Sequence, residues 1–216
     1  ICDVHDNGFV ARLIAPFPPA DEDDEKTSSK NNSSVILNIS LRAGLVSDAA
    51  KYFVGGDAEV AIWEKVWSEY SATSDNIAFD VLIAPHHCSW HSLSYDSWSE
   101  KGEDVEVSTD ARNALSQARE GAWIIASSKE IKDDESDPPC IRAKREYEDI
   151  LDDVSGSFLC LGEDSGDEPV EFDIKSSGPT KVLKSKANLA TPALVGVGGA
   201  AASSSVAYGQ QPFRHG

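Results

Sequence analysis

The chain has 216 residues, which is enough for one sizeable domain or for one domain with appended segments. Hydrophobic residues make up 40% of it, so we expect a packed core. Acidic residues outnumber basic ones by 37 to 19, and the formal net charge of −18 argues against a passive nucleic-acid binder, because such a surface repels phosphate backbones unless metal ions or a local basic patch intervene. It does not exclude a metal-dependent enzyme, since a bound dication inverts the local field.

The first elements in chain order are strands separated by a polar loop. Residues 1–17 predict two short strands, of which "FVARLIAPF" is the clearer. The segment 20–34 is charged and polar, which predicts a loop whose acidic run at 21–25 is a solvated tip or, as the alternative, a cation site. The following "SVILNISLRAG" alternates apolar and polar residues, which is the period of a half-buried strand.

Strand then gives way to helix at Gly55-Gly56-Asp57. The run "AAKYFVGGD" predicts a strand that stops at the double glycine. Apolar residues then recur at positions 60, 63, 66, 67 and 70, a helical spacing. After a short linker, the nearly continuous apolar run "FDVLIAP" predicts a buried strand that ends in "HHCSWHS".

The second half of the chain continues this alternation. We expect Thr109 to cap a helix that runs through Arg119, and "AWIIASS" to form another buried strand. Residues 140–151 have helical character, and "GSFLCLGE" and "VEFDI" are expected to pair as closing strands. Strands that alternate with helices indicate an α/β layered domain. From about Lys181 the chain is poor in charge and rich in Gly, Ala and Ser, so the predicted organisation is a domain over 1–180 and a flexible tail over 181–216.

The cysteines and the chain's start bear on its setting. Cys2, Cys88, Cys140 and Cys160 form no CxxC or zinc-knuckle pattern, so we interpret them as reduced thiols of a cytoplasmic protein. No signal peptide is visible, and the longest apolar run is too short to span a bilayer. The chain starts at Ile1 and contains no methionine, from which we expect a fragment of a larger product.

Two strand ends carry residues suited to chemistry. Asp57 follows two glycines at a strand-to-helix junction, where it either caps the helix expected to start at Ala58 or serves a site. His86, His87 and His91 are three of the chain's five histidines and fall within six residues at the mouth of a strand, where α/β folds place their ligands. Imidazole and carboxylate together suit zinc, or iron and manganese if further oxygens contribute.

The order of these motifs resembles a known family. "NNSSVILNIS", "YFVGGDAEVAIWEKV" and "FDVLIAPHHCSWHS" are similar to the motifs of metallo-β-lactamase-fold proteins of the ComEC-like group, named after a DNA-uptake channel protein with a hydrolase domain. That group has an Asn-Asn-x-Ser strand, then a strand ending in Gly-Asp, then one ending in His-His-Gly-Ser. The resemblance covers roughly residues 10–165 and implies the C-terminal part of a four-layered αββα sandwich.

The resemblance also implies a site. Asp57 would bridge two divalent metal ions, most simply zinc with manganese or iron as alternatives, and one of His86 and His87 would be the last histidine ligand. Asp57 and His86 would be catalytic, and Asn32, Ser89 and His91 would contact the substrate. A metal-bound hydroxide would attack a phosphorus or carbonyl centre.

Three departures separate this chain from the family pattern. The leading His-x-His-x-Asp-His motif is absent, since the early "DVHDNG" does not match it, so this chain alone supplies half of a dinuclear site. Cys88 replaces the glycine of His-His-Gly-Ser, where it would coordinate metal, be oxidised or, as we prefer, fill space. The stretch 136–140, "SDPPC", stands where the family often has His-Pro.

These observations lead to a functional expectation with one alternative. We expect a metal-dependent hydrolase, acting as a phosphodiesterase or nuclease on a nucleotide or nucleic-acid phosphodiester, whose fold is completed by a missing N-terminal part of the same product or by a partner chain. The alternative is a catalytically degenerate metallo-β-lactamase-fold module that binds a partner through its acidic surface. In either case no membrane association is expected.

Overall fold

The computed structural model describes residues 3–5, 8–18, 33–165 and 168–183. The chain divides into two units, 1–182 and 183–216, and only the first is described beyond a single residue. The acidic run at 21–25, the Asn31-Asn32 pair and the expected tail from residue 184 onward therefore lie outside the described residues.

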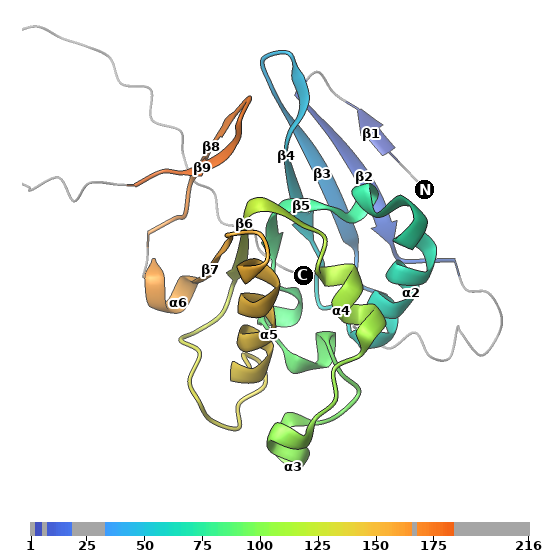
Figure 1. Ribbon diagram of the computed structural model, residues 1–216, viewed down its shortest axis with the longest axis vertical. Coiled ribbons are helices and arrows are strands. Elements are labelled where there is room, and N and C mark those ends of the chain that lie inside the picture. Colours follow the sequence, from blue (N-terminus) through green and yellow to red (C-terminus); the bar gives the residue numbers. More distant parts are fainter. Residues whose placement is uncertain (1–2, 6–7, 19–32, 166–167, 184–216) are drawn as a thin grey trace, which may run out of the picture. The chain divides into compact units, whose positions relative to one another are not determined.

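A mixed seven-stranded sheet forms the centre of the first unit (Figure 1). Its strands lie side by side in chain order: β1 (Asp3–His5), β2 (Phe9–Ala15), β3 (Ile36–Ala43), β4 (Val46–Val54), β5 (Phe79–Ile83), β6 (Ala118–Ala126) and β7 (Ser157–Cys160). β1 to β4 pair antiparallel, whereas β4 to β7 pair parallel. The carboxyl ends of β4, β5, β6 and β7 consequently share one edge of the sheet.

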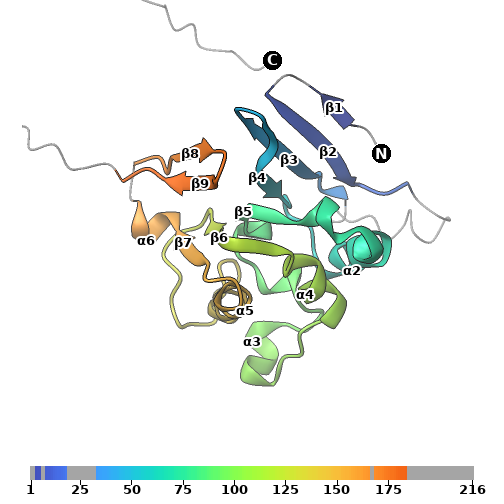
Figure 2. The same cartoon turned by 45° about the horizontal axis from the view of Figure 1, so that its top comes forward.

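Each parallel pair is joined by a helix. These connecting helices are α2 (Val60–Tyr70), α4 (Thr109–Leu115) and α5 (Ile141–Asp152). Because successive right-handed crossovers that move in one direction place their helices on one face, α2, α4 and α5 cover the same side of the sheet (Figure 2). The shorter elements are η2 (Ser71–Ile77), η3 (Pro85–His87), η4 (Trp90–Ser92), α3 (Trp98–Lys101), η5 (Gly102–Asp104) and α6 (Leu161–Asp164).

The main core lies between this helical layer and the sheet. Its largest fully buried side chains include Trp63 of α2, Phe53 of β4 and Phe79 of β5. The Trp63 and Phe53 rings meet edge to face at 5.9 Å between centroids, and Phe79 stacks on Phe53 at 6.4 Å. Such aromatic pairs contribute about 0.5–1.5 kcal/mol each beyond the area they bury. The helical spacing read from the sequence therefore predicts the buried face of α2 correctly.

The opposite face of the sheet is also apolar but is covered differently. Val81, Ile125 and Leu159 are buried there. A two-stranded hairpin, β8 (Phe172–Lys175) and β9 (Gly178–Lys181), contacts β3 and β4 on this side (Figure 2). An apolar cleft of about 320 Å³ remains between hairpin and sheet. The described residues thus form an α/β unit with one helical layer and one large sheet, and a second large sheet is not among them.

Several boundaries expected from the sequence are wrong. Ser108 rather than Thr109 is the N-cap of α4, since its hydroxyl accepts a hydrogen bond from the Ala111 N–H. α4 ends at Leu115, and Arg119 lies in β6, which starts earlier than its apolar run. The strand within "GSFLCLGE" does not pair with "VEFDI": β7 pairs parallel with β6, and β8 pairs with β9.

No helix in the described part of the chain is long and apolar enough to cross a membrane.

Candidate metal centre

In the turn after β4, glycine residues allow the backbone to lie close to neighbouring side chains. A Cβ atom added at Gly55 would lie 2.6 Å from Cζ2 of Trp63, and Gly56 has a φ of +54°. The Asp57 N–H donates a hydrogen bond to the Ser34 hydroxyl at 3.2 Å, so the segment before β3 meets this turn. α2 starts at Val60, and its N-cap residue, Glu59, provides no side-chain cap. The alternative that Asp57 caps a helix starting at Ala58 is therefore wrong, and its carboxylate is left to face the strand edge.

The loop after β5 has an unusual backbone. His86, His87 and Cys88 all have positive φ values, of 48°, 56° and 68°. A left-handed conformation costs a residue other than glycine roughly 1–2 kcal/mol. The His86 N–H donates to the Gly56 carbonyl at 2.8 Å, which links this loop to the turn after β4. Three successive strained residues persist only where the surroundings impose them, and such segments cluster at functional sites.

His87 and Asp57 face each other across this edge. His87 Nε2 lies 4.0 Å from Asp57 Oδ1, and both side chains are about half exposed. His87 Nδ1 lies 2.9 Å from the Ser127 carbonyl oxygen, at the end of β6. The Ser127 carbonyl only accepts, so this contact assigns the proton of a neutral His87 to Nδ1 and leaves the Nε2 lone pair on the side of Asp57; the Ser127 hydroxyl lies further away, at 3.4 Å. This is the arrangement of metal-binding histidines, whose second ring nitrogen is held by a carbonyl or carboxylate.

The other expected site residues are placed differently. His86 is half-buried, and its Nδ1 is buried without a hydrogen-bond partner in the described structure. Ser89 is fully buried, and its hydroxyl accepts from the His91 N–H at 3.2 Å, so it shapes the loop. His91 remains partly exposed. Asn32 lies outside the described residues.

The donor set around Asp57 fits a metal ion in part. Zinc sites take three or four protein ligands. Across the described residues, no group of three or more His, Cys, Asp and Glu side chains is arranged to hold a metal ion. Asp57 and His87 are thus two suitable donors, and any further ligands have to come from elsewhere.

The Cys88 thiol of the histidine loop lies in the protein core. Cys88 is fully buried, and burial raises its pKa well above the usual value. The Cys88 side chain belongs to the main hydrophobic core, which supports the interpretation that it fills space. The Cys140 N–H donates to the Cys88 carbonyl at 3.0 Å, so the loop before α5 supports the histidine loop from below.

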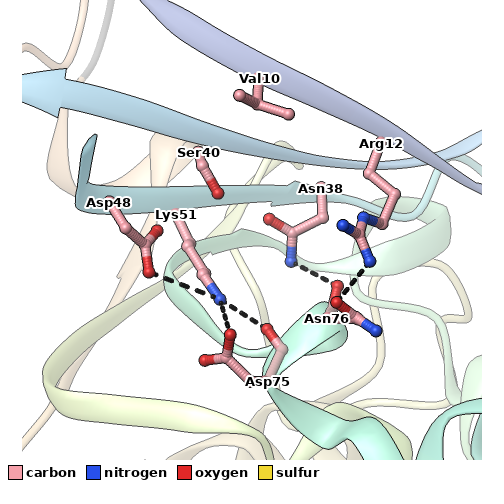
Figure 3. Close-up of a pocket in the computed structure, with 8 residues that line it drawn as sticks. All are labelled: Val10, Arg12, Asn38, Ser40, Asp48, Lys51, Asp75 and Asn76. Carbon is pink, nitrogen blue, oxygen red and sulfur yellow. Dashed lines mark hydrogen bonds and ion pairs between the residues drawn. The ribbon is translucent and has the colours of Figure 1, made fainter. Parts of the chain in front are cut away.

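A polar pocket that the sequence does not indicate lies at the other end of the sheet, away from the carboxyl ends of β4 to β7. This pocket, of about 130 Å³, lies on the helix-covered face beside η2 (Figure 3). Lys51 is 5% exposed and pairs with the Asp75 carboxylate at 2.8 Å, while Asn38 donates to the Ala78 carbonyl at 2.8 Å. The alternation in β3 and β4 places these side chains on the helix-covered face, but their partners come from η2, which no local pattern indicates.

Charges in this pocket compensate one another. The hydrogen bond from Lys51 holds the pKa of Asp75 below its usual value. Burial raises the pKa of Asp80, which accepts from the Lys51 backbone N–H at 2.7 Å and pairs with Arg119 at 3.3 Å. Three carboxylates (Asp48, Asp75, Asp80) face Lys51 and Arg119. We therefore assign the cluster to fixing η2 against the sheet.

Comparison with known protein families, with curated proteins and with solved structures found no match for this chain.

Proposed function

We propose that this protein is a metal-dependent hydrolase of the metallo-β-lactamase fold that cleaves a phosphodiester. The observation that carries the proposal is the pair formed by Asp57 and His87, with the His87 tautomer set by the Ser127 carbonyl. The pair stands at the carboxyl ends of parallel strands, which is where open α/β sheets bind their ligands.

The sequence motifs and the geometry support each other. The family resemblance named Asp57 and left His86 and His87 as alternatives. His87 has a ring nitrogen 4.0 Å from Asp57, whereas the Nδ1 of His86 is buried, so we assign the ligand to His87. Asp57 Oδ1 and His87 Nε2 are 4.0 Å apart, and two donors that share one tetrahedral zinc ion lie about 3.4 Å apart, so a modest side-chain movement brings them to one ion.

The proposal requires more ligands than the described residues provide. We infer that a further segment, from the same gene product or from a partner chain, supplies them and also covers the apolar face that carries Val81, Ile125 and Leu159, which would complete the four-layered sandwich. When bound, two divalent ions, zinc or else manganese or iron, would activate water and stabilise the charge that develops on the phosphate oxygens.

The net charge of the chain favours some phosphodiester substrates over others. A net charge of −18 opposes the approach of long duplex DNA, so a nucleotide or a short oligonucleotide fits better. Cys88, Cys140 and Cys160 are free and buried, which suits the reducing cytoplasm that we propose as its location.

Hydrolysis of thymidine 5′-(p-nitrophenyl phosphate) in the presence of Zn²⁺ or Mn²⁺ tests the proposal on the protein as its gene encodes it. We expect His87→Gln and Asp57→Asn each to reduce kcat/KM by at least about 10²-fold, because each removes a donor to the ion that activates water. Asp152→Asn, at an exposed carboxylate at the end of α5, is the matched control and keeps wild-type activity. Wild-type protein that cleaves no phosphodiester with any of these ions refutes the proposal.

One observation favours a second candidate, an interaction module without catalysis. In the part of the chain that the structure describes, no third metal-type side chain joins Asp57 and His87. In this case the strained loop would be a remnant, and the protein would fold and bind its partner without metal. Metal content separates the two candidates, since two bound ions favour the hydrolase and none favours the module.

A further inference from the structure

A second histidine at the same edge of the sheet has a buried acidic partner. His91 Nε2 lies 3.9 Å from Asp137 Oδ2. The His91 side chain is 45% exposed, whereas that of Asp137 is only 10% exposed. The two residues are 46 positions apart, in η4 and in the loop before α5.

Asp137 is held in place by the backbone of the histidine loop. Its Oδ1 accepts a hydrogen bond from the Trp90 N–H at 3.0 Å. Its Oδ2 is fully buried and accepts no hydrogen bond from any described residue. A buried carboxylate oxygen without a donor is costly, by several kcal/mol for a charged group, so a donor is required.

His91 Nε2, 3.9 Å from this oxygen, is one donor that the geometry offers. The Tyr147 hydroxyl, which is buried without a partner and is influenced by the charge of Asp137, is the alternative. At 3.9 Å, His91 Nε2 and Asp137 Oδ2 lie beyond hydrogen-bond distance, and Nε2 donates to Oδ2 if it carries a proton and the two side chains move closer. Nδ1 is then the unprotonated nitrogen of neutral His91, and no hydrogen bond involves it within the described residues. On this assignment the two histidines of one loop have opposite tautomers: His87 is protonated at Nδ1, towards a carbonyl, and His91 at Nε2, towards a carboxylate.

We propose that His91 and Asp137 form a proton-transfer dyad, in which His91 Nδ1 protonates the leaving oxygen of the phosphodiester and Asp137 is the positioning residue. This inference rests on the proposed hydrolysis. It assigns His91 a catalytic role beyond the substrate contact that the sequence suggests, and it gives Asp137 a role that the sequence does not reveal.

Water adds to phosphorus, and the P–O bond to the leaving alcohol breaks with its electron pair going to that oxygen. The oxygen takes the Nδ1 proton of doubly protonated His91 and leaves as an alcohol. The ring keeps its Nε2 proton toward Asp137, and the proton released by the attacking water restores Nδ1. A positioned proton donor of this kind contributes typically about 10²–10⁴-fold in rate.

The tautomer of His91 is measurable without any activity. Two-bond ¹H–¹⁵N correlation spectra distinguish the two ring nitrogens, and His91→Gln assigns the signals among the five histidines. We expect neutral His91 to carry its proton on Nε2 in the wild type and to become a tautomer mixture in Asp137→Ala. Asp133→Asn, in the same loop, is the control and leaves the His91 signals in place. A wild-type His91 protonated on Nδ1 overturns the dyad and would mean that interior water serves Asp137 instead.

The dependence of the hydrolysis rate on the leaving group tests whether His91 acts as a general acid. A dinucleoside monophosphate expels an alkoxide, which needs a proton, whereas thymidine 5′-(p-nitrophenyl phosphate) expels a stable phenolate. We expect His91→Gln to slow the first substrate by at least about 10²-fold and the second by less than about 10-fold, because only the first needs general acid catalysis. Equal losses on both substrates overturn the catalytic role. If wild-type protein hydrolyses neither, the proposed function fails, while the tautomer measurement still decides whether His91 and Asp137 are paired.

Discussion

Replacing Cys88 should reveal the strain stored in the histidine loop. Cys88 has a φ of 68°, which glycine adopts without the cost that other residues pay, whereas Cys140 is equally buried but has an ordinary φ of −116°. At either position the glycine variant has one buried Cβ fewer than the alanine variant, which costs about 0.8 kcal/mol. The glycine variant also has more freedom in the unfolded chain, which lowers its stability further. Only at position 88 does it also remove the left-handed strain of about 1–2 kcal/mol.

The difference in stability between the glycine and alanine variants at position 88, compared with the same difference at position 140, measures that strain. We expect Cys140→Gly to be less stable than Cys140→Ala by about 0.5 kcal/mol, because Cys140 is also the N-cap of α5, where glycine is favoured over alanine, and Cys88→Gly to be at least as stable as Cys88→Ala. Urea unfolding followed by the fluorescence of the five tryptophans measures all four free energies of unfolding. A glycine penalty of equal size at both positions would refute the inference that the loop is strained.

Two further predictions concern the packing and the polar pocket. Gly55→Ala should destabilise the protein by about 1–3 kcal/mol, because its Cβ would lie 2.6 Å from the Trp63 ring. Gly8→Ala shows whether the clash is responsible, since nothing lies within 4 Å of that site and its φ is not in the left-handed region. The lowered pKa of Asp75 makes its stabilising contribution present above the unfolded pKa, near 3.8, and lost as the pH falls through the lower folded value. Asp75→Asn should therefore lower the free energy of unfolding at pH 7 but not at the most acidic pH where the fold persists; equal losses at both would contradict the ion pair with Lys51. Because Asp75 is 79% exposed, the loss should stay below about 1 kcal/mol.

Local patterns in the sequence predict most of the first unit. Alternation predicts β3, and helical spacing predicts α2, because each buries one face against the same core. The start of β6 is missed because Arg119 and Glu120 are polar, and Arg119 is needed there for its ion pairs with Asp48 and Asp80. β9 is missed because its sequence, "GPTK", carries no strand pattern and it forms only by pairing with β8.

The candidate site was predictable in its residue types but not in its geometry. The cluster of histidines and the Gly-Asp turn drew attention to Asp57 and His87. The partner that decides between the histidines, the Ser127 carbonyl, is a backbone atom and leaves no signal in the sequence. The sequence does not indicate Asp137 either, because this residue lies 46 positions after His91 and comes near it only in the folded chain.

Metal content of the protein as its gene encodes it tests the central claim, that Asp57 and His87 are ligands of a divalent metal centre. Native mass spectrometry during titration with Zn²⁺ counts the bound ions directly. We expect two ions on the wild type and on Asp152→Asn, and fewer on Asp57→Asn and on His87→Gln. A wild-type protein that binds no ion, or ligand variants that bind as many as the wild type, would contradict the account.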